Sequence, residues 1–142
     1  MADSTNTDRV EFELVSPQKL LKSEPVEMVV VPGAEGDFGV LPGHSLLIAT
    51  VRPGVIDIHE GGQVRESIFV SGGFAEVSPD RCTVLAEEAI PVGDIDKAAA
   101  EARLEDAKAA LAKAEEDPET GTAAADRELK AAEAMVAAIP QH

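Results

Sequence analysis

The sequence is poor in aromatic residues and cysteine, and each shortage excludes a kind of site. It has no Trp, no Tyr and four Phe, too few to form a stacking platform for bases or sugars. Cys82 is the only cysteine, so neither an intrachain disulfide nor a zinc site built on cysteines can form. Cys82 lies in a predicted strand with no neighbouring base, and we expect a buried, inert thiol.

Positive charge is also scarce. The chain has 12 Lys and Arg against 27 Asp and Glu, for a net charge of −15. The acidic excess extends over both halves of the chain, with −9 over residues 1–93 and −6 over residues 94–142. Phosphate-rich partners require clustered Lys and Arg. The composition therefore predicts no nucleic-acid binding and no attachment to an anionic membrane surface.

Long hydrophobic runs are absent. No stretch approaches the roughly 20 apolar residues of a membrane-spanning helix, so direct membrane insertion is not expected. The start of the chain, MADSTNTDR, is too polar and acidic for a secretory signal. We expect a cytoplasmic protein in which residues 1–9 form a flexible N-terminus.

The pattern of residues changes at Pro91-Val92-Gly93. Ten of the 11 Gly lie at or before Gly93, whereas 17 of the 23 Ala lie after it. Before this point, short apolar runs are separated by Gly and Pro, as is typical of strands; after it, apolar residues recur at helical spacing. The sequence predicts a β-sandwich, or flattened barrel, over residues 10–90 and an α-helical hairpin over residues 91–142.

Short predicted strands recur about every ten residues in the first part of the chain. Val55–His59 alternates most clearly, and Glu60-Gly61-Gly62 after it is typical of a hairpin turn. The other predicted strands are Val10–Val15, Gln18–Leu21, Val26–Val31, Leu46–Thr50, Gln63–Val70, Phe74–Ser78 and Arg81–Leu85. This spacing favours a sandwich or flattened barrel and argues against a parallel sheet.

Two alanine-rich helices are predicted after Gly93, with Asp94 as the N-cap of the first and residues 115–122 as the connecting loop. Each helix carries an apolar seam with steps of four and three residues, which is typical of packed helix pairs. The seam residues are Ala100, Leu104, Ala107, Leu111 and Ala114, then Ala125, Leu129, Ala132, Val136 and Ile139. Because Ala buries little surface, the hairpin is expected to be held weakly. It either moves or lies statically on the sandwich.

The segment from Pro32 to His44 is the densest motif. It lacks the Gly-Lys-Ser/Thr of a P-loop and is not followed by a helix, so we expect its glycines in tight turns. Its acidic and apolar side chains are expected together at one end of the sandwich, as a surface for a protein partner. The sequence contains no recognisable nucleophile–base pair and no metal-ligand spacing. We expect an interaction module without catalytic residues, metal or cofactor.

Five segments in this order resemble the ε subunit of bacterial F-type ATP synthase, the counterpart of the mitochondrial δ subunit. They are FELVSP (residues 12–17), PGAEGDFGVLPGH (32–44), VRPG (51–54), FVSGGFAEV (69–77) and TVLA (83–86). The resemblance extends from about residue 10 to about residue 139. It implies a ten-stranded β-sandwich followed by a two-helix hairpin, the same architecture that the residue patterns predict.

The resemblance implies a non-catalytic rotor subunit of the F1 central stalk. Such a subunit joins the c-ring to the γ subunit and so couples proton transport to ATP synthesis in the α3β3 head. The complex is peripheral, on the cytoplasmic face of the bacterial inner membrane. Asp37 takes the place of an acid that faces the c-ring, and His44 that of a loop that approaches γ and the ring. The implied γ and c-ring interface is Glu35, Asp37, Phe38, Leu41, Pro42 and His44.

In many members of the family the hairpin inhibits ATP hydrolysis when it extends along γ to the head. Two features predict weak regulation here. Some members bind ATP in the hairpin through an Asp-x-x-Arg-Ala stretch, and the nearest match, Asp126-Arg-Glu-Leu129, has Leu in place of that Arg. The hairpin is also acidic, and its second helix offers only Arg127 and Lys130 to an acidic partner segment.

A second class of protein also fits the residue patterns: a free-standing β-sandwich that binds a small molecule in a pocket beneath its helices. Such a protein would work as a monomer without partners. A rotor subunit would instead co-purify with γ, and this difference separates the two hypotheses.

Overall fold

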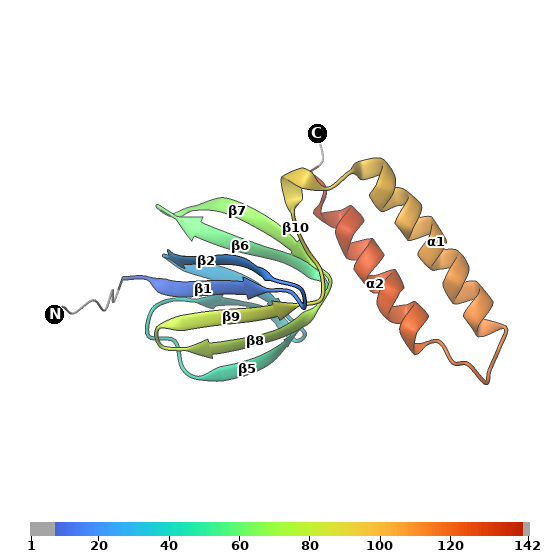
Figure 1. Cartoon of the computed structure of the whole chain (residues 1–142), viewed down its shortest axis with the longest axis horizontal. Helices are drawn as coiled ribbons and strands as arrows, with labels where there is room; N and C mark the ends of the chain where they lie inside the picture. The colour runs from blue at the N-terminus through green and yellow to red at the C-terminus, as the bar shows by residue number, and fades with distance from the viewer. Residues whose placement is uncertain (1–7, 141–142) are drawn as a thin grey trace.

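The computed structural model describes residues 8–140, which form a β-sandwich beside a helical hairpin (Figure 1). The strands are β1 (Val10–Val15), β2 (Leu20–Val26), β3 (Met28–Gly33), β4 (Gly36–Val40), β5 (Leu47–Val51), β6 (Gly54–Glu60), β7 (Gln63–Val70), β8 (Gly73–Ser78), β9 (Arg81–Ala86) and β10 (Ala89–Pro91). A 3₁₀ turn over Val92–Asp94 leads to α1 (Lys97–Glu115) and α2 (Ala123–Ala138). Most of the flexible N-terminus predicted over residues 1–9 lies outside the described residues.

The strands form one curled sheet in the order β10-β7-β6-β3-β5-β8-β9-β1-β2, with β4 paired to β3 beside this path. Neighbouring strands are antiparallel, as expected, except that β1 and β9 run parallel. These two strands are some 65 residues apart in the chain, so no local turn pattern predicts their pairing. That pairing brings the start of the sandwich beside its end.

Curling of the sheet buries side chains from β1–β9 in a single, mostly aliphatic core. On β1 the alternation places Val10, Phe12 and Leu14 inside, each at most 2% exposed. Full burial of such a side chain contributes about 1.5–3 kcal/mol. Cys82 lies in the same core, and burial raises the pKa of its thiol to about 12. The core therefore holds the thiol in its unreactive form.

Ion pairs connect the two ends of the curled sheet. Lys22 and Glu24 on β2 pair with Glu66 and Arg65 on β7, at N–O distances of 2.9 and 2.5 Å. These side chains are 23–40% exposed, so each pair contributes little to stability. They nevertheless align β2 with the β6–β7 hairpin.

Two strands, β4 and β10, are not predicted from the sequence. Gly36 and Gly39 make β4 resemble a loop, but pairing with β3 overrides that weak local preference. β10 has three residues and ends in Pro91. The prediction for the second strand is shifted, because Pro17 and Gln18 lie in a bend before β2 rather than within it.

The helix prediction is correct except for its first residue. Asp94 is not the N-cap of α1, because it lies in the 3₁₀ turn. Asp96 takes that position, and its Oδ1 accepts a hydrogen bond from the backbone N–H of Ala99 at 3.2 Å. Neither helix is long and apolar enough to cross a bilayer, and residues 8–140 contain no other candidate span.

The hairpin packs on the sandwich through a small cluster centred on Phe69. This side chain points out of β7, yet it is fully buried, because Ala100 of α1 and Met135 of α2 cover it. Within the predicted seam, Ala100, Ala107 and Ala132 are buried, whereas the other seven residues are partly exposed. Met135 lies beside the seam because α2 faces the sandwich as well as α1.

Candidate interaction surfaces

The turn between β3 and β4 carries two exposed acids. Gly33 pairs with Gly36 across a two-residue turn, with Glu35 at its tip and Asp37 one residue into β4. The Asp37 side chain is 59% exposed, and its Oδ1 accepts a bond from Nη2 of Arg52 at 2.6 Å. We call Gly33–Asp37 the β3–β4 tip. It presents the carboxylates of Glu35 and Asp37 at the same end of the sandwich as the turn between β5 and β6.

The backbone of the β3–β4 tip leaves no room for a side chain at Gly33. The half-buried Phe38 packs against the core. An added Cβ at Gly33 would lie 3.0 Å from the Phe38 ring and 2.7 Å from the Gly36 carbonyl oxygen. Glycine is therefore required at Gly33 for close approach, while Gly36 adopts a φ of 137° that side chains disfavour.

Leu41, Pro42 and His44 lie in the loop between β4 and β5, at the other end of β4 from Asp37. The backbone N–H of Gly43 donates to the Pro79 carbonyl at 2.6 Å, which attaches this loop to the β8–β9 turn. Expecting the acids and His44 at one end was wrong. The glycine-rich segment forms a five-residue strand, which separates them by roughly 15 Å.

The outer face of the sheet carries exposed apolar side chains that the sequence analysis missed. Phe74 on β8 pairs with Leu85 on β9, Leu85 with Val15 on β1, and Val15 with Leu20 on β2. Phe74, Leu85 and Leu20 are 58%, 53% and 56% exposed. We call these four residues the apolar row. A groove of about 400 Å³ runs along it, between Val15, Phe74 and Leu85.

The apolar row continues toward the β4–β5 loop. Ile48, on the outer side of β5, is 75% exposed and pairs with Glu76 on β8, two residues from Phe74 on the same face. Leu46 and Leu41 in the loop are 79% and 54% exposed. Exposed apolar side chains gathered on one face in this way are typical of protein–protein contacts. The one sequence signal for this exposed apolar surface was that β8 and β9 carry apolar residues on both faces of the strand.

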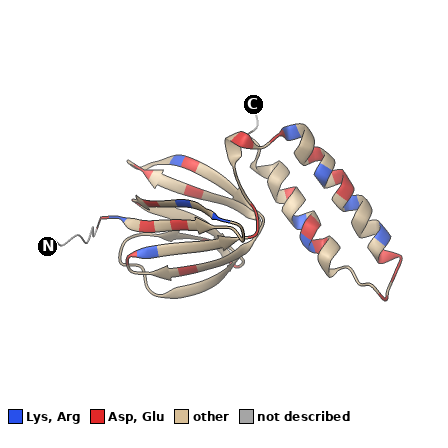
Figure 2. Cartoon of the chain, in the orientation of Figure 1, with Lys and Arg blue, Asp and Glu red and all other residues tan. Residues whose placement is uncertain are grey.

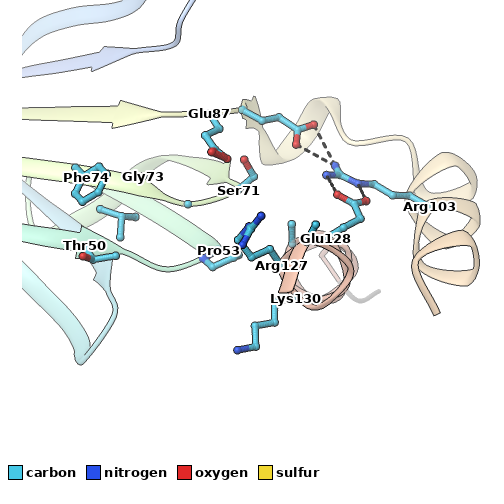
Figure 3. A pocket seen from close by; sticks show the side chains of 15 residues that line it. Thr50, Pro53, Ser71, Gly73, Phe74, Glu87, Arg103, Arg127, Glu128 and Lys130 are labelled. Atoms are coloured by element: carbon cyan, nitrogen blue, oxygen red, sulfur yellow. Dashed lines mark hydrogen bonds and ion pairs between the residues drawn. The ribbon is translucent and has the colours of Figure 1, made fainter. Parts of the chain in front are cut away.

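A cleft of about 590 Å³ separates the sandwich from α2. Figure 3 shows Arg127 pointing toward Pro53 and Ser71, whereas Lys130 points away. At the edge of the cleft, Arg103 of α1 binds Glu128 of α2 at 2.8 Å and Glu88 before β10 at 3.1 Å.

We call Arg103, Glu88 and Glu128 the ionic node. The hydrogen bonds between Arg103 and Glu128 raise the pKa of Arg103 and lower the pKa of Glu128. The node connects both helices to the sandwich. It also leaves Arg103 with two carboxylate partners inside the chain.

The described residues contain no candidate metal centre. Within residues 8–140, no three His, Cys, Asp or Glu side chains lie close enough to hold a metal ion. His44 is bonded through Nδ1 to the Ser45 carbonyl at 2.7 Å, and His59 lies on β6. Figure 2 shows basic and acidic residues interspersed along the strands and helices.

Comparison with known proteins identifies similar chains. Residues 9–92 match the family model for the beta-sandwich domain of the ATP synthase delta/epsilon chain. The chain is 60% identical over 132 residues to the ATP synthase epsilon chain of Paramagnetospirillum magneticum, covering 93% of this chain and 98% of that one. It is 53% identical over 138 residues to the epsilon chain of Rhodospirillum rubrum, covering 97% and 98%.

A solved structure is similar over both parts of the chain. It is a chain in the Euglena gracilis mitochondrial ATP synthase, solved as OSCP/F1/c-ring in rotational state 1. The TM-score is 0.77 and the identity 27%, and the match covers 97% of this chain and 86% of that chain. The likeness therefore includes the hairpin as well as the sandwich.

Proposed function

This chain belongs to the ATP synthase delta/epsilon chain family, and we propose that it acts as a non-catalytic rotor subunit of the F1 central stalk. In this role it joins the c-ring to γ and couples proton transport to ATP synthesis in the α3β3 head. The observation that carries the proposal is similarity to epsilon chains along both the sandwich and the hairpin. We place it at the cytoplasmic face of the bacterial inner membrane, as a peripheral part of the complex.

The apolar row and the β4–β5 loop form the proposed contact with γ. Together with Ile48 on β5, they expose Phe74, Leu85, Leu20 and Leu46, and each of these five side chains is 53% or more exposed. Covering these side chains contributes about 25 cal/mol for each Å² of apolar surface removed from water. A subunit that transmits torque requires this wide contact, because a single point of attachment would slip.

The β3–β4 tip is the proposed contact with the c-ring. Glu35 and Asp37 are both exposed there, and the tip lies at the other end of β4 from the loop that we assign to γ. The two partners therefore meet different surfaces of the sandwich. His44, Leu41 and Pro42 belong to the γ contact in this proposal.

The hairpin is proposed to regulate ATP hydrolysis weakly and without a bound nucleotide. Its most buried cation, Arg103, is already bound to Glu88 and Glu128. The basic residues of α2 are Arg127 and Lys130, and the cleft beside them also contains Glu87. This charge balance favours neither an anionic ligand nor an acidic segment of the head.

Capture of partners from detergent-solubilised membranes tests the rotor function. We expect the tagged chain to retain γ, the c-ring and the F1 head, identified by mass spectrometry. Phe74→Asp should abolish γ binding, because the new carboxylate would lose its water when γ covers the apolar row. Val64→Asp on β7, at a side chain that is 50% exposed, should leave γ binding intact. A chain captured alone, which instead binds a metabolite, would support the free-standing ligand-binding alternative.

Deletion of residues 94–142 tests the proposed regulation. We expect little change in membrane ATP hydrolysis, and a large activation would contradict weak inhibition. Because deletion uncovers Phe69, the truncated chain is best compared with and without Phe69→Ser, which removes the exposed aromatic side chain.

A further inference from the structure

The β3–β4 tip is supported by a residue that lies outside the β3 and β4 strands. Arg52 lies in the short turn between β5 and β6, and its guanidinium reaches both strands of the tip. We propose that Arg52 is a positioning residue that holds the carboxylate of Asp37 in place for the ring-facing contact. This inference rests on the function proposed above, in which Asp37 meets the c-ring.

The backbone of Arg52 is itself fixed against β3. Its N–H donates to the Pro32 carbonyl at 2.8 Å, and the N–H of Ala34 donates to the Thr50 carbonyl at 2.8 Å. These two bonds align the end of β5 with the start of the tip. The Arg52 side chain therefore begins from a defined position, and its orientation is not left to a mobile loop.

The side chain connects the two strands of the tip. Nη1 donates to the Gly33 carbonyl on β3 at 2.6 Å, and Nη2 binds Oδ1 of Asp37 on β4 at 2.6 Å. The planar guanidinium provides both donors at a fixed spacing. A Lys at this position has a single nitrogen on a flexible stem, and it could not hold both acceptors with the same geometry.

Arg52 occupies one side of the Asp37 carboxylate and leaves the other accessible. Its bond is to Oδ1, and the Asp37 side chain is still 59% exposed. The second oxygen can therefore accept a hydrogen bond from a donor on a polar loop of the partner. The pairing holds the Asp37 carboxylate in one orientation before the partner arrives, which lowers the entropy lost on binding.

The pair contributes little to folding. Arg52 is 43% exposed, and exposed ion pairs have small effects on stability. Loss of Arg52 should therefore change ring binding while the melting temperature stays nearly constant. A merely structural residue would show the reverse.

The test measures the affinity of full-length variants, bound to γ, for purified c-ring. We expect Arg52→Gln to weaken binding about threefold to tenfold, a change comparable to the net contribution of one ordinary hydrogen bond. Arg52→Lys should recover only part of this loss. In a chain that carries Asp37→Asn, Arg52→Gln should add no further weakening, because its effect acts through that carboxylate. Arg65→Gln should leave the affinity unchanged, because Arg65 is about as exposed as Arg52 but pairs with Glu24, far from the tip.

Three results would overturn the inference in different ways. If Asp37→Asn leaves the affinity unchanged, the proposed ring contact fails and the inference fails with it. If Asp37→Asn weakens binding but Arg52→Gln does not, the ring contact stands and the positioning role is wrong. If the two effects simply add, Arg52 contacts the ring itself and does not act through Asp37.

Discussion

The sandwich core and the contact between sandwich and hairpin bury different side chains. The core joins 17 buried residues from strands across the sheet, most of them Val, Ile or Leu. The hairpin contact centres on Phe69, Ala100 and Met135, with partly exposed residues around them and the ionic node at one edge. Because burial of apolar surface is the main stabilising contribution, the sandwich should be far more stable than the docking of the hairpin. The two regions therefore tolerate change differently.

The largest expected effect is on the core. Phe12→Ala removes a fully buried side chain, and we expect the free energy of unfolding to fall by about 3–5 kcal/mol. Urea denaturation followed by circular dichroism measures this change. A loss below 1 kcal/mol would mean that the core repacks freely and that the contrast with the hairpin is overstated.

Phe69→Ala should act mainly on the hairpin. It removes the outward side chain that both helices cover, so amide exchange in α1 and α2 should accelerate at least about tenfold, equivalent to about 1.4 kcal/mol. Exchange in β1 and β9 should change much less. Phe74→Ala is the matched control, since that Phe is exposed. If sandwich and hairpin amides accelerate together, the chain is one cooperative unit.

The ionic node should make hairpin docking sensitive to acid. Hydrogen bonds to Arg103 lower the pKa of Glu128, so this pair stabilises the docked state above the unfolded pKa of about 4.3. The contribution is lost as pH falls through the lower, folded pKa, while Arg103 stays charged throughout. We expect hairpin amide exchange, corrected for its intrinsic pH dependence, to accelerate below about pH 4. Glu128→Gln should remove this step, and a step that persists would assign it to other carboxylates.

The smallest expected effect is that of a nucleotide. Arg103 is already bound to two carboxylates, and Leu129 stands where a family ATP-binding stretch has Arg, so millimolar ATP should leave the melting temperature unchanged. Differential scanning fluorimetry in the presence and absence of ATP measures this. A rise in melting temperature that increases with ATP concentration would show that the cleft binds the nucleotide.

Local patterns predicted most elements but not the surfaces between them. The alternation in Val55–His59 and the turn at Gly61-Gly62 correctly predicted the β6–β7 hairpin. Gly36 and Gly39 made β4 resemble a loop in the sequence. The acids and His44 were therefore expected together, although β4 separates them. Arg52 lies in the VRPG segment, but its contacts gave no sequence signal, because its two acceptors lie 15 and 19 residues away.

The sequence by itself determined the order of strands followed by helices, the alanine seams, and the absence of disulfide or cysteine–zinc chemistry. These follow from properties of neighbouring residues: side-chain alternation, helical spacing and composition. Only the tertiary structure decided the parallel β1–β9 pair, the apolar row, the ionic node and the bonds of Arg52 to Gly33 and Asp37. Each of these brings together residues far apart in the chain, and their register depends on how the whole sheet curls around its core.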